Sequence, residues 1–439
     1  MLALAGFFGF EPDGVGPSGN SLKQLASGIH PELDADVQQF RYSELDRDLN
    51  TLPSGSERDL FTGILDNRQG RIEESIRLIE NTLPITRTAT PQRMAIALES
   101  LADDYLKSFR YRDASRTYQE LLAAYAGQLK PGELQDVKDD AGTIKLLTGA
   151  PPQTIHWDGP LDIPMHKSPL GTFDVNLTVN GVTGSWILDT GANFSVLSAS
   201  FAKRLGVVAS VGTAQTKGSS GAENALHTGL IPEVRIGGAT IHNVIVLIFD
   251  DKNLLIRTGP KDTYQIHAVI GYPVFQALGK VTFTRAGQFL AGSNAAIGSA
   301  FSRMFMNKLT PLLQCGIHDD ERLFAFDTGA SGSEFFRPYY REFAQDFAGL
   351  KLRKTQTSGA GGAKEQPVYI LKSAKLMVSG YSVVLYDVPV FPKPLENGVD
   401  LTYGNLGRDL VAGFDSFTLD FTRLRFYLGK QVAASETVH

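Results

Sequence analysis

The pattern of apolar and polar positions changes near residue 150. From Leu60 to Tyr125, apolar residues recur three and four positions apart, which predicts amphipathic helices, and Leu33 to Leu49 shows a weaker form of the same pattern. After residue 160, short segments such as 173–179 alternate apolar with polar residues, and turn residues such as Asn180-Gly181 separate them. The sequence therefore predicts a multidomain protein with an all-α N-terminal region followed by an all-β region.

The helical region contains a partial internal repeat. Its earlier and later copies share an offset of 39 positions, since 102 − 63 = 39. The matched pairs are Gly63 with Ala102, Gly70 with Phe109, Ser75 with Ala114, and Ile79 with Tyr118. This spacing resembles the tetratricopeptide repeat (TPR), in which small residues let two antiparallel helices approach closely. Two units are predicted, or three if Leu33 to Leu49 belongs. Two interpretations stay open: a groove for a protein partner, or a helical prodomain or spacer.

Breaks in composition predict the domain boundaries. The stretch before residue 160 is rich in proline and glycine, which end helices and interrupt strand ladders. The first ten residues are apolar and contain an Ala-x-Ala step, so they are a candidate remnant of a signal peptide. The predicted parts are a partly helical extension (1–55), a TPR-like domain (56–150), a linker (151–160), and two β-rich lobes (161–300 and 301–439).

An apolar run that ends in Asp-Thr-Gly-Ala occurs twice in the β-rich region. The copies are Asp189-Thr190-Gly191-Ala192 and Asp327-Thr328-Gly329-Ala330, and the aspartates are 327 − 189 = 138 positions apart. Each copy is followed by a glycine-rich tip and then by a short loop that ends in glycine, Val269-Ile270-Gly271 in the first copy and Asn405-Leu406-Gly407 in the second. The tip glycines are Gly218 and Gly221 in the first half, and Gly359, Gly361 and Gly362 in the second.

Together these motifs resemble the retropepsin-like aspartic proteases, here with two lobes fused in one chain. The resemblance covers about residues 160 to 430 and implies an all-β bilobal acid-protease fold with pseudo-twofold symmetry. The second lobe is the closer match, because Gly407-Arg408-Asp409-Leu410 keeps a family motif from which Gly271-Tyr272-Pro273 departs. That departure affects the first lobe's supporting contacts more than its catalytic loop.

The resemblance also implies roles for the motif residues. Asp189 and Asp327 would form the catalytic dyad, because two close carboxylates share a proton and can act as base and acid. The threonines would bond across the pseudo-twofold axis, and the glycines would make room for backbone N–H groups beside the carboxylates. The alanines replace a hydroxyl residue of pepsin-like relatives, which predicts a less acidic pH optimum. These supporting residues are Thr190 and Thr328, Gly191 and Gly329, and Ala192 and Ala330.

Composition excludes several other classes of function. A net charge of −5 and a pI near 5.9 argue against nucleic acid as a general partner. Cys315 is the single cysteine, so no intrachain disulfide or thiolate cluster can form, and the eight histidines are scattered. The sequence therefore predicts neither a metal nor a cofactor. No run of eighteen apolar residues occurs, so no membrane span is predicted.

The predicted function is an aspartic-type endopeptidase that hydrolyses peptide bonds. The glycine-rich tips would be flaps that close over an extended polypeptide, and one chain would supply a monomeric active site. Two alternatives remain: a dimer in which each lobe pairs with a second chain, and a non-catalytic peptide-binding or scaffold protein. The missing cysteine pairs, the apolar N-terminus and the helical module favour a bacterial periplasmic or exported protein, with the cytoplasm as the alternative.

Overall fold

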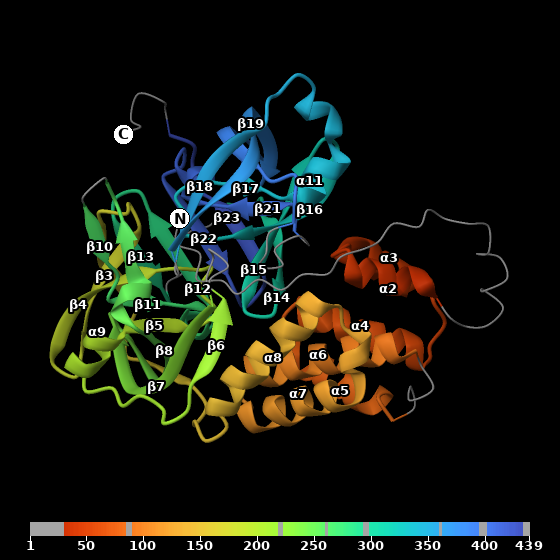
Figure 1. Cartoon of the computed structure of the whole chain (residues 1–439), viewed down its shortest axis with the longest axis horizontal. Coiled ribbons are helices and arrows are strands. Elements are labelled where there is room, and N and C mark those ends of the chain that lie inside the picture. The colour runs from red at the N-terminus through yellow and green to blue at the C-terminus, as the bar shows by residue number, and fades with distance from the viewer. Residues whose placement is uncertain are drawn as a thin grey trace. The chain divides into compact units, whose positions relative to one another are not determined.

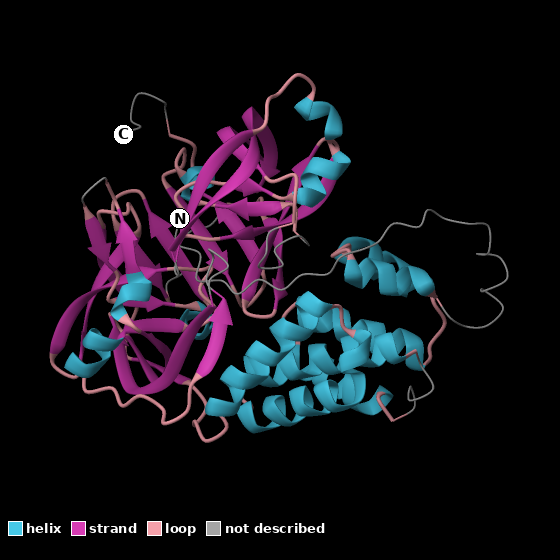
Figure 2. Cartoon of the chain, in the orientation of Figure 1, coloured by secondary structure: helices cyan, strands magenta, loops and turns pink. Residues whose placement is uncertain are grey.

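The computed structural model describes residues 30–84, 90–217, 223–259, 262–292, 298–359, 362–394 and 402–432. Two compact units make up this part of the chain, and the boundary between them lies between Thr148 and Gly149. The first, called the helical unit below, consists of helices, and the second, called the β-rich unit, consists mainly of strands (Figure 2). The architecture agrees with the predicted helical region followed by an all-β region.

The helices of the helical unit follow one another with short connections (Figure 1). They are α2 (Pro31–Gln38), α3 (Tyr42–Thr51), α4 (Ser56–Arg68), α5 (Ile72–Thr82), α6 (Pro91–Lys107), α7 (Tyr111–Tyr125), η3 (Ala126–Gln128) and α8 (Pro131–Leu146). Consecutive helices pack on each other, most extensively α6 on α7 and α4 on α5. Gly63 makes the α4–α5 approach close, because a Cβ there would lie 2.8 Å from Cγ1 of Ile79.

One type of turn joins three helix pairs in the described part of this unit. The turn residue has a left-handed φ in each pair, at Phe40 (57°), Gly70 (72°) and Phe109 (58°). The next residue is an arginine whose backbone N–H donates to the carbonyl five positions earlier: Arg41 to Asp36, Arg71 to Asp66, and Arg110 to Tyr105. The stretch 33–49 is thus two helices rather than one, and it repeats the turn of the later pairs. Whether these pairs are tetratricopeptide repeats that bind a partner stays a prediction.

The β-rich unit begins with the strands of its first lobe. These are β1 (Thr154–Trp157), β2 (Leu161–Lys167), β3 (Phe173–Val179), β4 (Val182–Leu188), β5 (Ser195–Ser198), β6 (Ala214–Lys217), β7 (Glu223–Ile236), β8 (Ala239–Phe249), β9 (Leu255–Arg257), β10 (Thr263–Gln265), β11 (Ala268–Ile270), β12 (Lys280–Thr284) and β13 (Gln288–Ala291). Short helices α9 (Ala199–Arg204), η4 (Asp251–Leu254) and α10 (Tyr272–Leu278) connect some of them.

The second lobe repeats much of this order. Its strands are β14 (Ser302–Asn307), β15 (Thr310–Ile317), β16 (Asp320–Phe326), β17 (Glu334–Phe335), β18 (Arg353–Gly359), β19 (Gly362–Val378), β20 (Tyr381–Val390), β21 (Gly404–Leu406), β22 (Ser416–Asp420) and β23 (Arg425–Leu428). The helices α11 (Arg337–Glu342), η5 (Ala344–Phe347) and η6 (Arg408–Val411) complete the lobe.

Strand β1 corrects the predicted linker. Residues 154–157, inside the stretch 151–160, pair antiparallel with β8, from Thr154 opposite His242 to Trp157 opposite Ala239. A segment of only four residues between proline and glycine gives no periodicity to read, yet Thr-Ile-His-Trp suits a pleated surface once a partner strand is present. Pairing with a distant strand therefore overrides the local loop signal.

A sheet shared by the lobes lies on the pseudo-twofold axis. Among the described residues it has six strands in the order β2, β13, β12, β22, β23, β14, so corresponding strands of the two lobes lie at equal distances from its centre. At the centre, β12 and β22 pair antiparallel around Thr282 and Thr418, whose hydroxyl oxygens are 2.8 Å apart. Phe283 and Phe417 stack beside them with ring centroids 4.7 Å apart. The shared sheet fixes one lobe against the other.

Candidate active site

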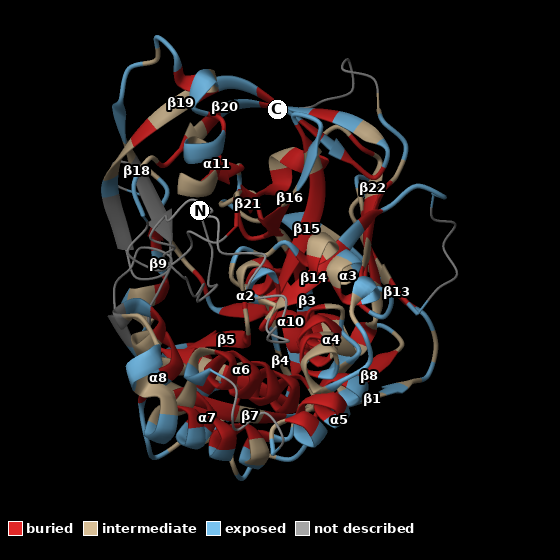
Figure 3. Cartoon of the chain, turned by 90° about the vertical axis from the view of Figure 1, so that its right-hand side faces the viewer, coloured by how far each residue is buried: buried red, intermediate tan, exposed pale blue. Residues whose placement is uncertain are grey.

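Asp189 and Asp327 occupy equivalent places at the ends of strands β4 and β16. Both side chains are fully buried, and the neighbouring strands of each lobe are largely buried as well (Figure 3). Strand β4 runs parallel to β11, and β16 runs parallel to β21. The backbone N–H of Asp189 donates to the carbonyl of Ile270 (3.1 Å), and that of Asp327 donates to the carbonyl of Leu406 (3.0 Å). The loops that end at Gly271 and Gly407 thus hold each aspartate at its strand end.

The motif glycines bring backbone donors and the opposite lobe close to the carboxylates. The N–H of Gly191 donates to Oδ1 of Asp189 (2.9 Å), and the N–H of Gly329 donates to Oδ1 of Asp327 (2.7 Å). A Cβ added at Gly191 would lie 2.6 Å from Cγ of Asp327. Only glycine leaves room for this approach, so the two carboxyl groups face each other across the lobe interface.

The motif threonines connect the two turns by reciprocal hydrogen bonds. The N–H of Thr190 donates to Oγ1 of Thr328 (3.0 Å), and the N–H of Thr328 donates to Oγ1 of Thr190 (3.1 Å). Each hydroxyl then donates to a carbonyl of the other lobe, Thr190 to Phe326 (3.1 Å) and Thr328 to Leu188 (2.7 Å). Both threonines are buried, so these bonds are shielded from water and fix the separation of the aspartates.

The motif alanines contribute their backbones to the same frame. The carbonyl of Ala192 accepts from the N–H of Tyr272 (2.8 Å), and the carbonyl of Ala330 accepts from the N–H of Arg408 (3.0 Å). Both alanines are fully buried. Their methyl groups offer no donor to the carboxylates, which removes one means of stabilising the ionised forms.

Sequence analysis missed a pair of serines that support the turns. Oγ of Ser195 accepts from the N–H of Gly271 (3.2 Å), and Oγ of Ser333 accepts from the N–H of Gly407 (3.0 Å). A Cβ at Gly271 would lie 2.3 Å from the backbone of Phe194, so no side chain fits there. The signal was present, because 333 − 195 = 138 is the offset that relates the two aspartates.

The two carboxyl groups differ in how strongly their surroundings favour ionisation. Burial raises the pKa of Asp189 well above its ordinary value, and the negative charge of Asp327 and a hydrogen bond with that carboxyl raise it further, while the N–H groups of Gly191 and Ala192 lower it. Burial also raises the pKa of Asp327, but the hydrogen bond with Asp189, the N–H of Gly329, the amide of Asn405 and the charge of Arg408 lower it. The two carboxyls therefore titrate as a coupled pair that shares one proton, and the larger number of polar groups around Asp327 favours that residue as the carboxylate.

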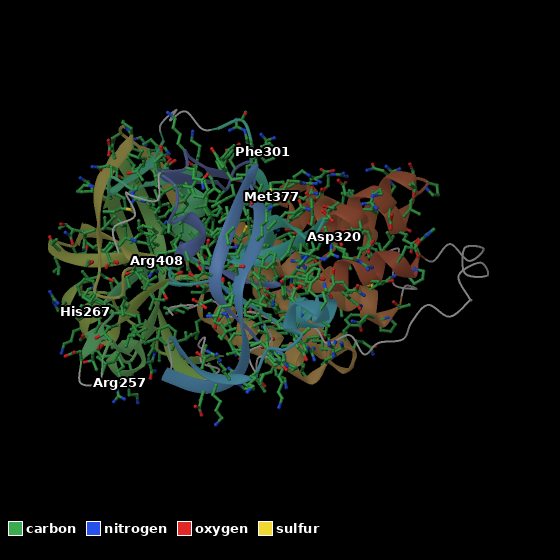
Figure 4. The ribbon with its side chains drawn as sticks, turned by 90° about the horizontal axis from the view of Figure 1, so that it is seen from above. Arg257, His267, Phe301, Asp320, Met377 and Arg408 are labelled. Atoms are coloured by element: carbon green, nitrogen blue, oxygen red, sulfur yellow. The ribbon has the colours of Figure 1, made fainter. Side chains whose placement is uncertain are left out.

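The second lobe has polar supports that the first lobe lacks. Nη1 of Arg408 donates to the carbonyls of Thr328 (2.8 Å) and Gly329 (3.0 Å), and Nη2 donates to the carbonyl of Leu170 in the first lobe (3.1 Å). Arg408 thus lies where the ribbons of the two lobes meet (Figure 4). The carboxylate of Asp409 accepts from N–H and Oγ–H of Ser333 (2.9 and 2.7 Å). In the first lobe, helix α10 begins at the corresponding place with Tyr272 and Pro273.

Each lobe carries a hairpin at the place of a predicted flap. Strands β6 and β7 pair up to Lys217 opposite Glu223, and strands β18 and β19 pair up to Gly359 opposite Gly362. The flap glycines Gly218, Gly221 and Gly361 lie outside the described residues. The described parts of both hairpins are therefore consistent with a pair of flaps, one from each lobe.

Other kinds of site are not evident in the described part of the chain. It contains no group of three or more histidine, cysteine or acidic residues arranged to hold a metal ion. None of its helices is both long enough and apolar enough to cross a membrane.

Comparison with known proteins identifies one segment. Residues 175–274 match the aspartyl protease family. This segment contains Asp189 and the loop that ends at Gly271, so the first lobe carries an aspartyl protease domain. No match is found among curated proteins.

Among solved structures, the chain is similar to two seed globulins. Basic 7S globulin from soybean is 11% identical, with 62% of this chain and 94% of that chain covered and a TM-score of 0.37. Conglutin gamma, a basic 7S globulin from lupine seeds, is 9% identical, with 63% and 96% covered and a TM-score of 0.39. The paired lobes, the shared sheet and the two crossed Asp-Thr-Gly turns together make the β-rich unit a pepsin-like bilobal fold.

Proposed function

We propose that this chain is an aspartic endopeptidase whose catalytic pair is Asp189 and Asp327. The observation that carries the proposal is the pair of buried carboxyls on turns locked together by the reciprocal threonine bonds. A binding protein would not need two acids buried against each other, because their mutual repulsion and desolvation cost stability. An enzyme gains from the same arrangement, since it sets one carboxyl as acid and the other as base.

The unequal pKa values assign the two roles. The Asp327 carboxylate takes a proton from a water molecule that attacks the scissile carbonyl carbon, while Asp189 gives its proton to the carbonyl oxygen. The resulting gem-diol collapses when Asp327 passes its proton to the amide nitrogen and Asp189 takes a hydroxyl proton back. The C–N bond breaks, both carboxyls return to their starting state, and no acyl-enzyme forms.

The two hairpins suit an extended peptide substrate. Strands β6–β7 and β18–β19 come from opposite lobes, so each lobe contributes one hairpin. A peptide held between two hairpins can form backbone hydrogen bonds as an added strand, which gives affinity with little dependence on its sequence. A flap from each lobe supports the retropepsin-like arrangement in particular, within one chain that supplies both turns.

The test is cleavage of a mixed peptide library by the wild type, Asp189→Asn and Asp327→Asn between about pH 3 and 7. Either substitution is expected to lower kcat/KM by about 10³-fold or more, because each removes one half of the acid–base pair. Asp250→Asn, in an exposed loop, is the matched control and should leave cleavage unchanged. Circular dichroism checks that all variants fold.

Two results would contradict the proposal. Residual cleavage at the wild-type rate in either dyad variant would place the chemistry elsewhere. A folded wild type that cleaves no peptide over the whole range, but still binds some of them in fluorescence anisotropy, would favour the non-catalytic peptide-binding function.

A further inference from the structure

A cross-strand pair beside each aspartate differs between the lobes. In the first lobe, Val196 of β5 lies opposite Val269 of β11. In the second lobe, Glu334 of β17 lies opposite Asn405 of β21. The offsets, 334 − 196 = 138 and 405 − 269 = 136, match those of the surrounding motifs. The pseudo-twofold axis therefore relates an apolar pair to a polar one.

The polar pair faces the catalytic centre. Nδ2 of Asn405 lies 3.5 Å from Oδ2 of Asp327. Residues directly opposite each other on antiparallel strands place their side chains on the same face of the sheet, so Glu334 lies beside Asn405 on this face. Its carboxyl is also close enough to Asp327 for that negative charge to raise the pKa of Glu334.

Both polar side chains are buried. Glu334 is 8% exposed and Asn405 is 2% exposed. Burial, together with the charge of Asp327, raises the pKa of Glu334 from 4.5 to about 8. Within the described residues, Oδ1 of Asn405 has no hydrogen-bond partner. A buried acceptor without a donor costs about 1–3 kcal/mol, so this pair is better suited to receive a donor from outside than to stabilise the fold.

We propose that Glu334 and Asn405 form a subsite that takes a lysine or arginine side chain of the substrate, next to the scissile bond. This inference rests on the proposed endopeptidase function. A cationic group supplies a counter-charge that lets the Glu334 carboxyl ionise, and its N–H donors satisfy Oδ1 of Asn405. Contact between Asn405 and Asp327 places the subsite beside the reacting bond.

The first lobe offers the opposite chemistry at the equivalent position. Val196 and Val269 are buried and apolar, so a charged substrate side chain there would lose its hydration without compensation. The expected substrate therefore has a basic residue on one side of the scissile bond and an apolar residue on the other.

The test uses matched peptides that differ only at the two residues flanking the scissile bond, each being lysine, arginine, glutamine or norleucine. Norleucine keeps the length of the lysine stem but lacks the charge. At one flanking position the full-length wild type is expected to cleave the lysine or arginine peptide at least about tenfold faster in kcat/KM than the norleucine peptide. At the other position the order is expected to reverse.

Substitutions at Glu334 and Asn405 test whether this pair sets the preference for a basic residue. Glu334→Val with Asn405→Val gives the second lobe the apolar pair of the first, and is expected to make norleucine the preferred residue at both positions. Glu334→Gln keeps the shape and is expected to abolish the preference for a cation over glutamine. If the double variant fails to fold, the single one decides.

The outcomes separate this inference from the proposed function. An active wild type that prefers norleucine at both positions, or a basic preference that survives Glu334→Gln, would overturn the subsite and leave the endopeptidase intact. If no peptide is cleaved, the endopeptidase proposal fails. Binding of the same peptides with a reduced scissile bond then tests the subsite alone: tighter binding of lysine than norleucine supports it, and equal or weaker binding rejects it.

Discussion

The two lobes of the β-rich unit have the same backbone frame and different side chains around it. In both, an aspartate N–H bonds to the loop that ends at Gly271 or Gly407, a glycine N–H bonds to the carboxylate, and a serine hydroxyl accepts from the loop glycine. The polar residues Glu334, Asn405 and Arg408 occur only in the second lobe's frame, where the first has Val196, Val269 and Tyr272. The backbone frame sets the distance between the two carboxyls, and the surrounding side chains make their pKa values unequal.

This difference would allow a nearly symmetric site to perform the asymmetric reaction proposed above. With identical surroundings, the shared proton would have no preferred aspartate. The charge of Arg408 interacts with both aspartates, but the amide of Asn405 donates to Asp327, where the first lobe has the apolar Val269. The four predictions below test first the shared frame and then the asymmetry.

The largest effect is expected from the threonines, which the lobes share. Thr190→Val or Thr328→Val leaves an N–H and a carbonyl of the other lobe buried without partners. Each is expected to lower the free energy of unfolding by about 2–6 kcal/mol. Urea unfolding followed by tryptophan fluorescence measures this, since both tryptophans, Trp157 and Trp186, belong to the β-rich unit.

Serine is the control at both threonine positions. Thr190→Ser and Thr328→Ser keep the hydroxyl and lose one methyl group, so each is expected to cost only about 1 kcal/mol. If one valine substitution lowers the free energy of unfolding strongly and the other does not, the two threonines do not support the lobes equally.

Arg408 tests the support found only in the second lobe. Arg408→Met removes the hydrogen bonds to three carbonyls and is expected to destabilise the β-rich unit by about 2–4 kcal/mol. It also removes a charge that lowers the pKa of Asp327, so the acidic limb of the kcat/KM profile should move to higher pH. Arg408→Lys keeps the positive charge but lacks the planar guanidinium group. It should therefore restore the position of the acidic limb more fully than it restores the free energy of unfolding. An unmoved limb in Arg408→Met would show that Arg408 does not act on the dyad.

Glu334 should make stability depend on pH. Its pKa is raised from 4.5 to about 8 in the folded state, so its favourable contribution is complete below about pH 4.5 and is lost as the pH rises to about 8. Glu334→Gln has no carboxyl to ionise at this position. The difference in free energy of unfolding between this variant and the wild type is therefore expected to change in favour of the variant by on the order of a few kcal/mol between about pH 4.5 and 8. Glu365→Gln, at an exposed glutamate, is the control. A difference that does not change with pH would contradict the burial of an acid here.

The alanines give the smallest and most specific test. A hydroxyl beside a carboxylate stabilises the ionised form, so Ala330→Ser is expected to lower the pKa of Asp327 and to move the acidic limb of the kcat/KM profile down by about one pH unit. Ala192→Ser should act on Asp189 and move the basic limb down instead. Movement of the same limb by both substitutions would refute the separate roles. A wild-type optimum near about pH 2 to 3 would refute the predicted effect of the alanines.

Local patterns accounted for the parts of the site that lie within one turn of chain. The Asp-Thr-Gly-Ala motifs, the strand before each and the loop glycines Gly271 and Gly407 are visible because the geometry they serve is made by consecutive residues. The 39-position offset of the helical repeat matched Gly70 with Phe109, and both have a left-handed φ at the turn of a helix pair. Strand β1 was missed because its partner, strand β8, lies elsewhere in the sequence.

The sequence by itself determined the order of the units, the doubling of the aspartate turn and the residue types that its chemistry requires, since these depend on short-range periodicity and spacing. Only the tertiary structure decided which side chains border the dyad. Glu334 and Asn405 are 71 positions apart, as 405 − 334 = 71, and although Asn405 lies in the loop that ends at Gly407, no motif connects it with Glu334. They meet because β17 and β21 pair across the fold, and contacts of that kind depend on strand register, which no local pattern in this chain specifies.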